Sequence, residues 1–553
     1  MGLLVKEGGR DRLEKRKADW VIKSQAIFTG DGSEPISGCI AIRGDRILAV
    51  GDERQMEGYL GPNTKQIDAG DRLVLPGFHD FHLHLWIGSL AHHYADLSTC
   101  YSEEATVQKI AEFAEERPDD PWVLGFGWHH INWPDQQLPT RHSLDQQISD
   151  RPVFLLNEEL HSAWLNTKAL EMVGIDRATK DPSFGRIERD EKGEPTGFLY
   201  ETAVVLALEA LDVPIEKKDE LMCGFLQQAA SLGITSVSDM LPLPGFEAGD
   251  PAWYAQYEAR GELTARIHFL IALDGDWGRA ERMREQYQSD KLQFSGLKQF
   301  VDGVPLTYTG YLLEPYTDSP GEVGATLFER ETYEKWIVEA DRRGFRARLH
   351  ACGDGAVRLA LDCFEKARKV NGPRDARHCI EHIEVIDPAD LGRFADLGVI
   401  ASMQPEHMTA GSVDTHAYVD RLGPERIRYT WPIGSLQKSG AQLIFSSDYP
   451  VVELNPLVGI YRAVTRRQYD GRPVDGWHPQ ERITLADALT YYTKAPAYGV
   501  FREHELGTLE PGKKADIIIL DRNLFSAEMD ELLETKVELT MMDGKVVYRR
   551  EGL

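Results

Sequence analysis

Hydrophobic and polar positions follow different patterns at the ends and in the middle of the chain. Toward both ends they alternate as in half-buried strands, and the pairs Gly44-Asp45 and Asp543-Gly544 are typical of hairpin turns. The alternating stretches are 20–22, 39–42, 46–50, 515–520, 537–540 and 545–548. We therefore predict one small β domain assembled from both termini, residues 1–75 and 500–553.

In the middle of the chain, short apolar runs alternate with segments of helix length. We expect strands at 75–84, 234–239, 266–272, 297–301, 346–350, 378–382, 399–404 and 443–448. Eight such strands predict an α/β fold, a parallel (β/α)8 barrel of the TIM type, over residues 76–499.

The first two barrel strands are too far apart for one crossover helix. We therefore predict a long insertion after the first strand, residues 90–225, which covers the active site. It contains strand candidates of its own at 122–126 and 153–156.

Composition and charge narrow the class of partner. The chain of 553 residues is 42% hydrophobic and 27% charged, as is usual for globular proteins. A net charge of −27 argues against nucleic acid or an anionic membrane as partner, because nothing would neutralise phosphates. Six scattered cysteines, no signal-like apolar segment and no run of 18 apolar residues favour a cytoplasmic protein without a membrane span.

The first candidate metal ligands are His82 and His84, at the end of the first predicted barrel strand. Positions two apart in a strand project to the same face, so both imidazoles can bind one metal ion. The alternative, two histidines on a solvent-facing edge, fits poorly with the flanking Leu75, Phe81 and Leu83.

Further candidates end other predicted strands, namely His350, His382 and Asp448. Active sites of this barrel are built at the carboxyl ends of its strands. One such histidine is usually a core residue, but this many ligand types at one rim indicate a metal centre.

Lys298 lies within a short apolar strand, where an unpaired charge is costly. Desolvation and metal charge would lower its pKa, so the neutral amine could react with CO2 and bridge two metal ions as a carbamate. The alternative is a lysine that pairs with Asp302 or extends out of the barrel mouth.

Motifs along nearly the whole chain resemble the amidohydrolase superfamily, in particular the amidohydrolase family 3 branch of YtcJ-like proteins and N-substituted formamide deformylases. They include LPGFHDFHLH, HSAWLNTKALEMVGI, GRIERDEKGEPTGFLYETA, LGITSVSD, LKQFVDG, LHACGDGAV, IEHIE, SMQP, SSDYPV and LGTLEPGKKADIIILD. The resemblance implies a barrel flanked by a β-sandwich, with one or two divalent ions, Zn2+ foremost, and a possible homodimer. It implies these ligands: His82, His84, Lys298, His350, His382 and Asp448.

Substrate contacts are expected from the insertion. His161, in HSAWLNTKAL, is the best single candidate, and Trp128 and Asp302 are further ones. The alternative for the tryptophans is a core of the insertion itself. The segment Asn-Glu-Glu-Leu before His161 departs from relatives, which commonly have an aspartate and a small residue there.

The function expected from these residues is hydrolysis of an amide-like C–N bond in a small N-formyl or N-acyl molecule. Metal-activated hydroxide would attack, Asp448 would act as general base and then acid, and His350 and His382 would hold the second ion or polarise the carbonyl. Two alternatives stay open at this point. One is a cyclic amide or amidine hydrolase or deaminase, and the other is a ligand-binding protein that has lost catalysis.

Overall fold

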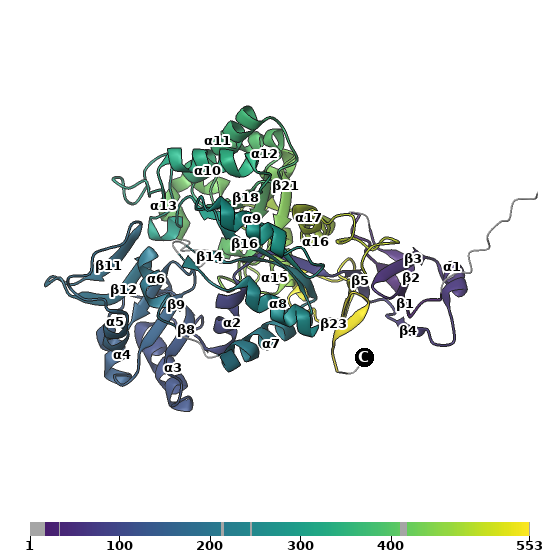
Figure 1. Cartoon of the computed structure of the whole chain (residues 1–553), viewed down its shortest axis with the longest axis horizontal. Coiled ribbons are helices and arrows are strands. Elements are labelled where there is room, and N and C mark those ends of the chain that lie inside the picture. The colour runs from purple at the N-terminus through teal and green to yellow at the C-terminus, as the bar shows by residue number, and fades with distance from the viewer. Residues whose placement is uncertain (1–16, 32–33, 212–214, 244–245, 410–416, 552–553) are drawn as a thin grey trace, which may run out of the picture.

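A barrel of eight parallel strands forms the centre of the protein (Figure 1). The structure is a computed structural model that describes residues 17–31, 34–211, 215–243, 246–409 and 417–551. The strands follow chain order around the barrel, and a parallel bridge between Leu83 and Tyr449 joins the first strand region to the last. They are β6 (Phe78–Leu83), β13 (Ile234–Met240), β16 (Arg266–Ala272), β17 (Leu292–Phe300), β18 (Ala347–Ala351), β19 (Cys379–His382), β20 (Ile400–Met403) and β21 (Gln442–Phe445).

All eight predicted barrel strands are present, which confirms the predicted fold class, but the first needs a correction. The predicted strand 75–84 is two strands, because β5 (Leu73–Pro76) pairs outside the barrel and β6 begins at Phe78. Gly77 separates them where the chain passes close to β13. A Cβ atom on Gly77 would lie 2.3 Å from Thr235 Oγ1, so only glycine allows this approach.

A second sheet of eight strands combines both ends of the chain. It curls so that its edge strand β3 meets the segment just before β22, with the Ile47 amide donating to the Lys513 carbonyl oxygen at 2.9 Å. Ile22 of one end and Ile519 of the other share one apolar core, so the curled sheet resembles a sandwich. Its strands are β1 (Trp20–Ile27), β2 (Ile36–Arg43), β3 (Arg46–Gly51), β4 (Lys65–Asp68), β5, β22 (Ile517–Leu520), β23 (Val537–Met542) and β24 (Lys545–Arg549).

Buried charges attach this terminal sheet to the barrel. Arg266 in β16 is fully buried and pairs with Asp516 and with Asp543 of the terminal sheet. A buried guanidinium is tolerated only with such partners, so these contacts fix the amino-terminal end of the barrel against the sheet.

The segment between β6 and β13 contains a six-stranded sheet of its own. The predicted strands 122–126 and 153–156 correspond to β8 and β9 of this sheet. One of its faces packs an aromatic cluster that includes Trp128 and Trp164. Its strands are β7 (Ala95–Asp96), β8 (Val123–Trp128), β9 (Val153–Asn157), β10 (Ser162–Leu165), β11 (Gly185–Arg189) and β12 (Pro195–Glu201).

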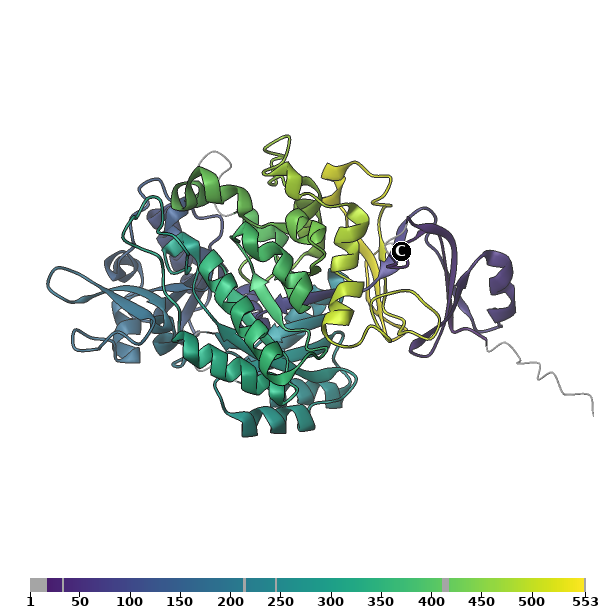
Figure 2. The same cartoon turned by 90° about the horizontal axis from the view of Figure 1, so that it is seen from above.

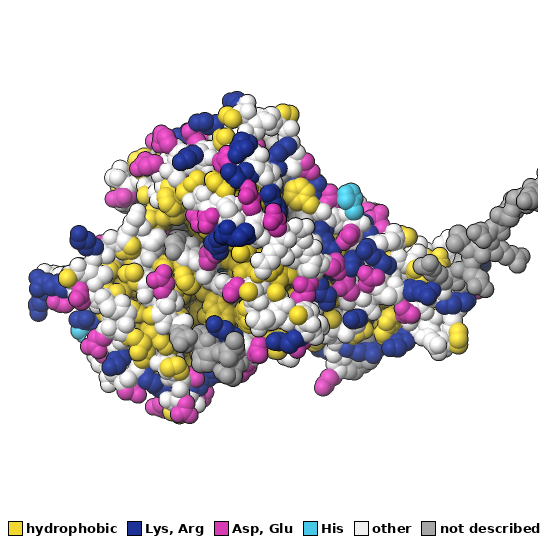
Figure 3. Space-filling view, viewed as in Figure 1, with side chains coloured by type: hydrophobic (Ala, Val, Ile, Leu, Met, Phe, Trp, Pro, Cys, Tyr) yellow, Lys and Arg dark blue, Asp and Glu magenta, His cyan; other side chains and the backbone are white. Residues whose placement is uncertain are grey.

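Figures 1 and 2 show this insertion and the terminal sheet at opposite ends of the molecule, with the barrel between them. On the face seen in Figure 3, hydrophobic side chains gather where the insertion meets the barrel. Among the described residues, no helix combines the length and apolar character needed to cross a membrane. The six cysteines are free thiols.

The helices are α1 (Glu53–Met56), α2 (Leu85–His93), α3 (Glu103–Glu116), α4 (Arg141–Gln147), α5 (Thr167–Val173), α6 (Thr202–Leu208), α7 (Ile215–Ser231), α8 (Pro251–Arg260), α9 (Trp277–Gln286), α10 (Arg330–Arg342), α11 (Asp354–Asn371), α12 (Leu391–Leu397), α13 (Ala417–Arg426), α14 (Ile433–Lys438), α15 (Pro456–Thr465), α16 (Leu485–Tyr491) and α17 (Lys494–Gly499).

Candidate metal centre and active site

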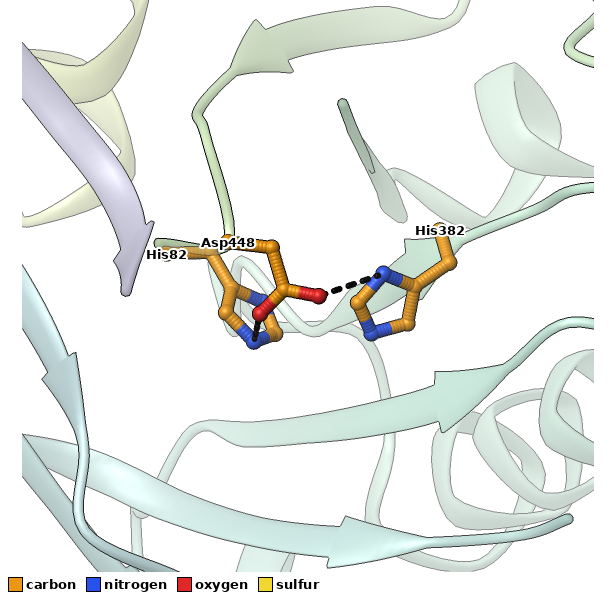
Figure 4. Close-up of side chains that lie close together, drawn as sticks. All are labelled: His82, His382 and Asp448. Carbon is orange, nitrogen blue, oxygen red and sulfur yellow. Dashed lines mark ion pairs between the residues drawn. The ribbon is translucent and has the colours of Figure 1, made fainter. Parts of the chain in front are cut away.

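Three barrel strands bring His82, His382 and Asp448 into one buried cluster (Figure 4). The Asp448 carboxylate lies between the two imidazoles, with Oδ1 3.2 Å from His82 Nε2 and Oδ2 3.7 Å from His382 Nδ1. His84 Nε2 lies 3.4 Å from the same Oδ1. Barrel closure creates this proximity, since the Asp448 amide donates to the His82 carbonyl oxygen at 2.7 Å.

Each of the three imidazoles is oriented by a hydrogen bond at Nδ1. In His82 and His84 this is the nitrogen remote from Asp448, whereas His382 Nδ1 also faces Asp448 Oδ2. An Nδ1 that donates its hydrogen to an acceptor leaves the Nε2 lone pair for a metal ion. Burial also lowers the pKa of His82 and of His382, which favours the neutral form that ligates. The Nδ1 acceptors are Glu381 Oε2 for His82 (2.7 Å), the Met240 carbonyl oxygen for His84 (2.8 Å) and Gln404 Oε1 for His382 (2.8 Å).

These hydrogen bonds leave lone pairs of imidazole nitrogen and carboxylate oxygen atoms facing one another in the cluster. With Nδ1 protonated, the Nε2 atoms of His82 and His84 are acceptors, and both point at the acceptor atom Asp448 Oδ1. That oxygen has no hydrogen-bond partner among the described residues. Converging acceptors repel unless a cation lies among them, so the donor set fits a divalent ion such as Zn2+.

Glu381 is held in place from two sides. It accepts from His82, and Arg348 donates to it at 2.6 Å through Nε. Although burial opposes ionisation, the charge of Arg348 and the contact with His82 hold the pKa of Glu381 well below its usual range. Glu381 is therefore an anion that orients a candidate ligand.

His350 and Lys298 lie beside this cluster. The ring centroid of His350 is 4.5 Å from that of His382, and its Nε2 contacts the Gly303 carbonyl oxygen at 3.1 Å, which leaves Nδ1 for a metal ion. Lys298 is fully buried, and its Nζ has no hydrogen-bond partner among the described residues. Burial lowers the pKa of Lys298 to about 8, so a neutral amine suited to carbamate formation is accessible near neutral pH.

Asp448 remains ionised despite its burial. Desolvation opposes its charge, and beside neutral His82 and His382 the carboxylate needs a nearby cation, such as the expected metal ion, to balance that charge. The side chain can therefore ligate a cation and accept a proton in the same place.

Backbone strain also concentrates here. His382, Asp448 and Glu201 have φ values of 75°, 67° and 49°, in the left-handed region that side chains disfavour. Each such residue costs about 1–3 kcal/mol, and such strain is typical of functional sites.

The cluster opens into a pocket between the barrel rim and the insertion. Carboxylate–imidazole pairs recur around it, with Nδ1 of His161 2.7 Å from Glu201 Oε2. Burial opposes a charge on His161, but the Glu201 carboxylate raises its pKa to about 9. The pocket is lined by His129, Ile131, Asn132, Glu158, Glu159, His161, Val304, Leu306, His350, Cys352, His382, Glu384, His407, Ala417, Tyr418, Asp448, Val451 and Val452.

The three residues predicted to contact substrate differ in their positions. His161 lines the pocket, and its ring centroid is 5.6 Å from that of His350. Trp128 does not line it, because its fully buried indole packs in the insertion core and donates to the Leu155 carbonyl oxygen at 3.1 Å. Asp302 is also withdrawn from the pocket, since its buried carboxylate accepts three backbone amides: Tyr311 (2.8 Å), Cys352 (3.1 Å) and Gly353 (2.9 Å).

Two further pocket residues, His407 and Glu384, were not among those predicted from the sequence. His407 Nε2 lies 3.6 Å from Asp448 Oδ2, and its Nδ1 lies 3.5 Å from Glu384 Oε1. Both residues follow strand ends in the stretches IEHIE and SMQPEH, and their proximity to family motifs was the available signal.

Comparisons with known proteins agree with this architecture. The Amidohydro_3 model, described as the amidohydrolase family, matches residues 65–548. Protein LONG AFTER FAR-RED 3 of Arabidopsis thaliana is 31% identical over 96% of this chain and 92% of that protein. The putative amidohydrolase YtcJ of Bacillus subtilis is 30% identical over 90% and 93%. The N-substituted formamide deformylase of Arthrobacter pascens is 28% identical over 97% and 99%.

The crystal structure of an uncharacterized metal-dependent hydrolase from Pyrococcus horikoshii matches with a TM-score of 0.73 and 25% identity, over 92% of this chain and 99% of that one. The protein is thus of the metal-dependent hydrolase class. More narrowly, the chain belongs to the amidohydrolase family, which confirms the resemblance of its motifs.

Proposed function

We propose that the protein hydrolyses an amide-like C–N bond of a small N-formyl or N-acyl compound. Zn2+ is the proposed metal, and His82, His84, Lys298, His350, His382 and Asp448 are the proposed ligands, with a carbamate on Lys298. The observation that carries the proposal is the convergence of imidazole Nε2 atoms on an ionised, buried Asp448 that borders the pocket. The similarity to a protein named as a deformylase supports the N-formyl class.

Each residue has a defined task in this proposal. A divalent ion, when bound, polarises a carbonyl group and makes water more acidic. Asp448 accepts the proton of the attacking water and returns it to the leaving nitrogen, which needs the carboxylate to be ionised beforehand. Protonated His161 donates a hydrogen bond to the substrate carbonyl oxygen, where negative charge develops during attack.

Metal analysis combined with turnover tests this function. The purified protein is expected to contain one to two equivalents of zinc, and chelation should abolish hydrolysis until zinc is restored. The substrate panel contains N-formyl amines, N-acyl amino acids, cyclic imides and cyclic amidines. Hydrolysis of the N-formyl and N-acyl members is the expected result.

Several outcomes would contradict the proposal. Activity that survives chelation would remove the metal from the reaction. Preferred turnover of the cyclic members would reassign the protein to ring opening or deamination. A metal-loaded protein that binds members of the panel without turnover would indicate a binding protein.

A further inference from the structure

The carboxylates that line the pocket differ in whether they have a partner among the neighbouring side chains. Glu159 Oε2 lies 3.4 Å from His129 Nε2, and Glu384 Oε1 lies 3.5 Å from His407 Nδ1. Each of these carboxylates therefore has an imidazole partner. Asp448 belongs to the metal cluster. Glu158 is the remaining carboxylate of the lining.

Glu158 directly follows β9 in the insertion, and its backbone amide donates to the Trp128 carbonyl oxygen at 3.0 Å. Within the part of the chain that the structure describes, its carboxylate has no hydrogen-bond or ion-pair partner. Burial raises the pKa of Glu158, because desolvation disfavours its charge. A partly buried carboxylate without a partner is costly, and a cationic ligand group would remove that cost.

The rest of the lining matches such a ligand. None of the described residues that line the pocket is a lysine or arginine, and its imidazoles either pair with carboxylates or belong to the metal cluster, so the lining offers an anionic substituent no unpaired cation. Apolar side chains complete the surface: Ile131, Val304, Leu306, Val451 and Val452. A short hydrocarbon body with a positive end group would therefore bury its apolar part and present its charge to Glu158.

We propose that Glu158 binds a cationic group of the substrate, so that the preferred N-acyl compounds carry a protonated amine or a guanidinium on a short alkyl body. The proposal rests on the proposed function for the acyl part and adds the charge of the substrate.

A pair of small probes of the same shape tests the charge preference by binding. Butylguanidinium stays protonated at neutral pH and does not ligate metals, and butylurea is its neutral counterpart of the same shape. Isothermal titration calorimetry on the metal-loaded protein should show butylguanidinium binding at least about tenfold more tightly, as for one charge-assisted hydrogen bond.

Two variants locate the effect. Glu158→Gln should abolish the preference and leave butylurea binding unchanged. Glu171→Gln is the matched control, because Glu171 is exposed on α5 of the same insertion and its loss changes the net charge equally. That control should retain the preference.

Equal binding of the two probes to the wild-type protein would overturn the proposal, as would a preference that survives Glu158→Gln or disappears in Glu171→Gln. These results are independent of the proposed reaction. A preserved cation preference in a protein that hydrolyses no N-acyl compound would reject the reaction alone, whereas N-acyl hydrolysis without the preference would reject the role of Glu158 alone.

Discussion

The barrel rim and the insertion both border the pocket, but they hold their side chains in different ways. On the rim, His82 and His382 stand at strand ends, and each donates from Nδ1 to a buried acceptor. On the insertion, Glu158 and His161 lie in the connection between β9 and β10. Strand ends fix a side chain within tight limits, whereas a connection can change its residues without disturbing the sheet. The rim is thus suited to chemistry and the insertion to the choice of substrate.

The largest effect is expected from Asp448→Asn on the rim. The amide retains an oxygen ligand but no longer accepts a proton, so kcat should fall about 10²–10⁴-fold while metal content largely persists. Steady-state kinetics with elemental analysis measure both quantities. A near-normal kcat would reassign the base, with Asp302 and Glu381 as the next candidates, although both are engaged in other hydrogen bonds.

Lys298→Ala tests the number of metal ions on the rim. Without the proposed carbamate, the protein should retain one equivalent of metal instead of two, and short carboxylic acids should partly restore the second. Metal analysis before and after addition of acetate measures this. A crystal structure with an unmodified Lys298 ammonium that points away from the histidines would contradict the carbamate and leave a single-metal enzyme.

On the insertion, His161→Ala should have a smaller effect. The loss of one polar contact should lower kcat/KM about tenfold without loss of metal. The contribution should also depend on pH. The pKa of His161 is raised to about 9, so its donating, protonated form is present below that pH and is lost above it. An unchanged kcat/KM on the true substrate would show that His161 does not contact the substrate and has a structural role.

Trp128→Phe should have the smallest effect on catalysis, because this side chain lies in the core of the insertion. The lost hydrogen bond and the small cavity should reduce the free energy of unfolding by about 2 kcal/mol. The value of kcat/KM should stay within about twofold of wild type. Denaturant unfolding and kinetics on the same preparation measure the two effects, and a large change in KM with unchanged stability would contradict the core assignment.

The fold could be predicted from sequence because barrel strands are buried on both faces and read as apolar runs. β16 was predicted with its observed limits, Arg266–Ala272. The sequence-based prediction joined β5 and β6 into one strand. Apolar residues continue across Gly77 while the chain passes from the terminal sheet into the barrel, so the hydrophobic pattern shows no boundary there. A pattern of burial does not reveal which sheet buries a residue.

The site was predictable only as far as strand ends define it. The proximity of His82, His382 and Asp448 was predictable because the carboxyl ends of parallel strands meet at one rim. The positions of Trp128 and His407 depend on how the insertion and the loops pack, which residue spacing does not determine. In the structure the Trp128 side chain lies in the core of the insertion, and His407, which follows β20, lies beside Asp448.

The curled terminal sheet has a consequence for synthesis. Arg46 donates to the Gly512 carbonyl oxygen across 466 positions of the chain, and β5 pairs with β22 just before the chain enters β6. At about 5–20 residues per second, a ribosome needs roughly 20–90 s to make the partner of the first strands. During that interval the open edge of β5 is exposed beside the strand that carries His82, and unpaired edges favour aggregation. The nascent chain is therefore expected to need chaperone protection until β22 has been made, long after its first metal ligands leave the ribosome.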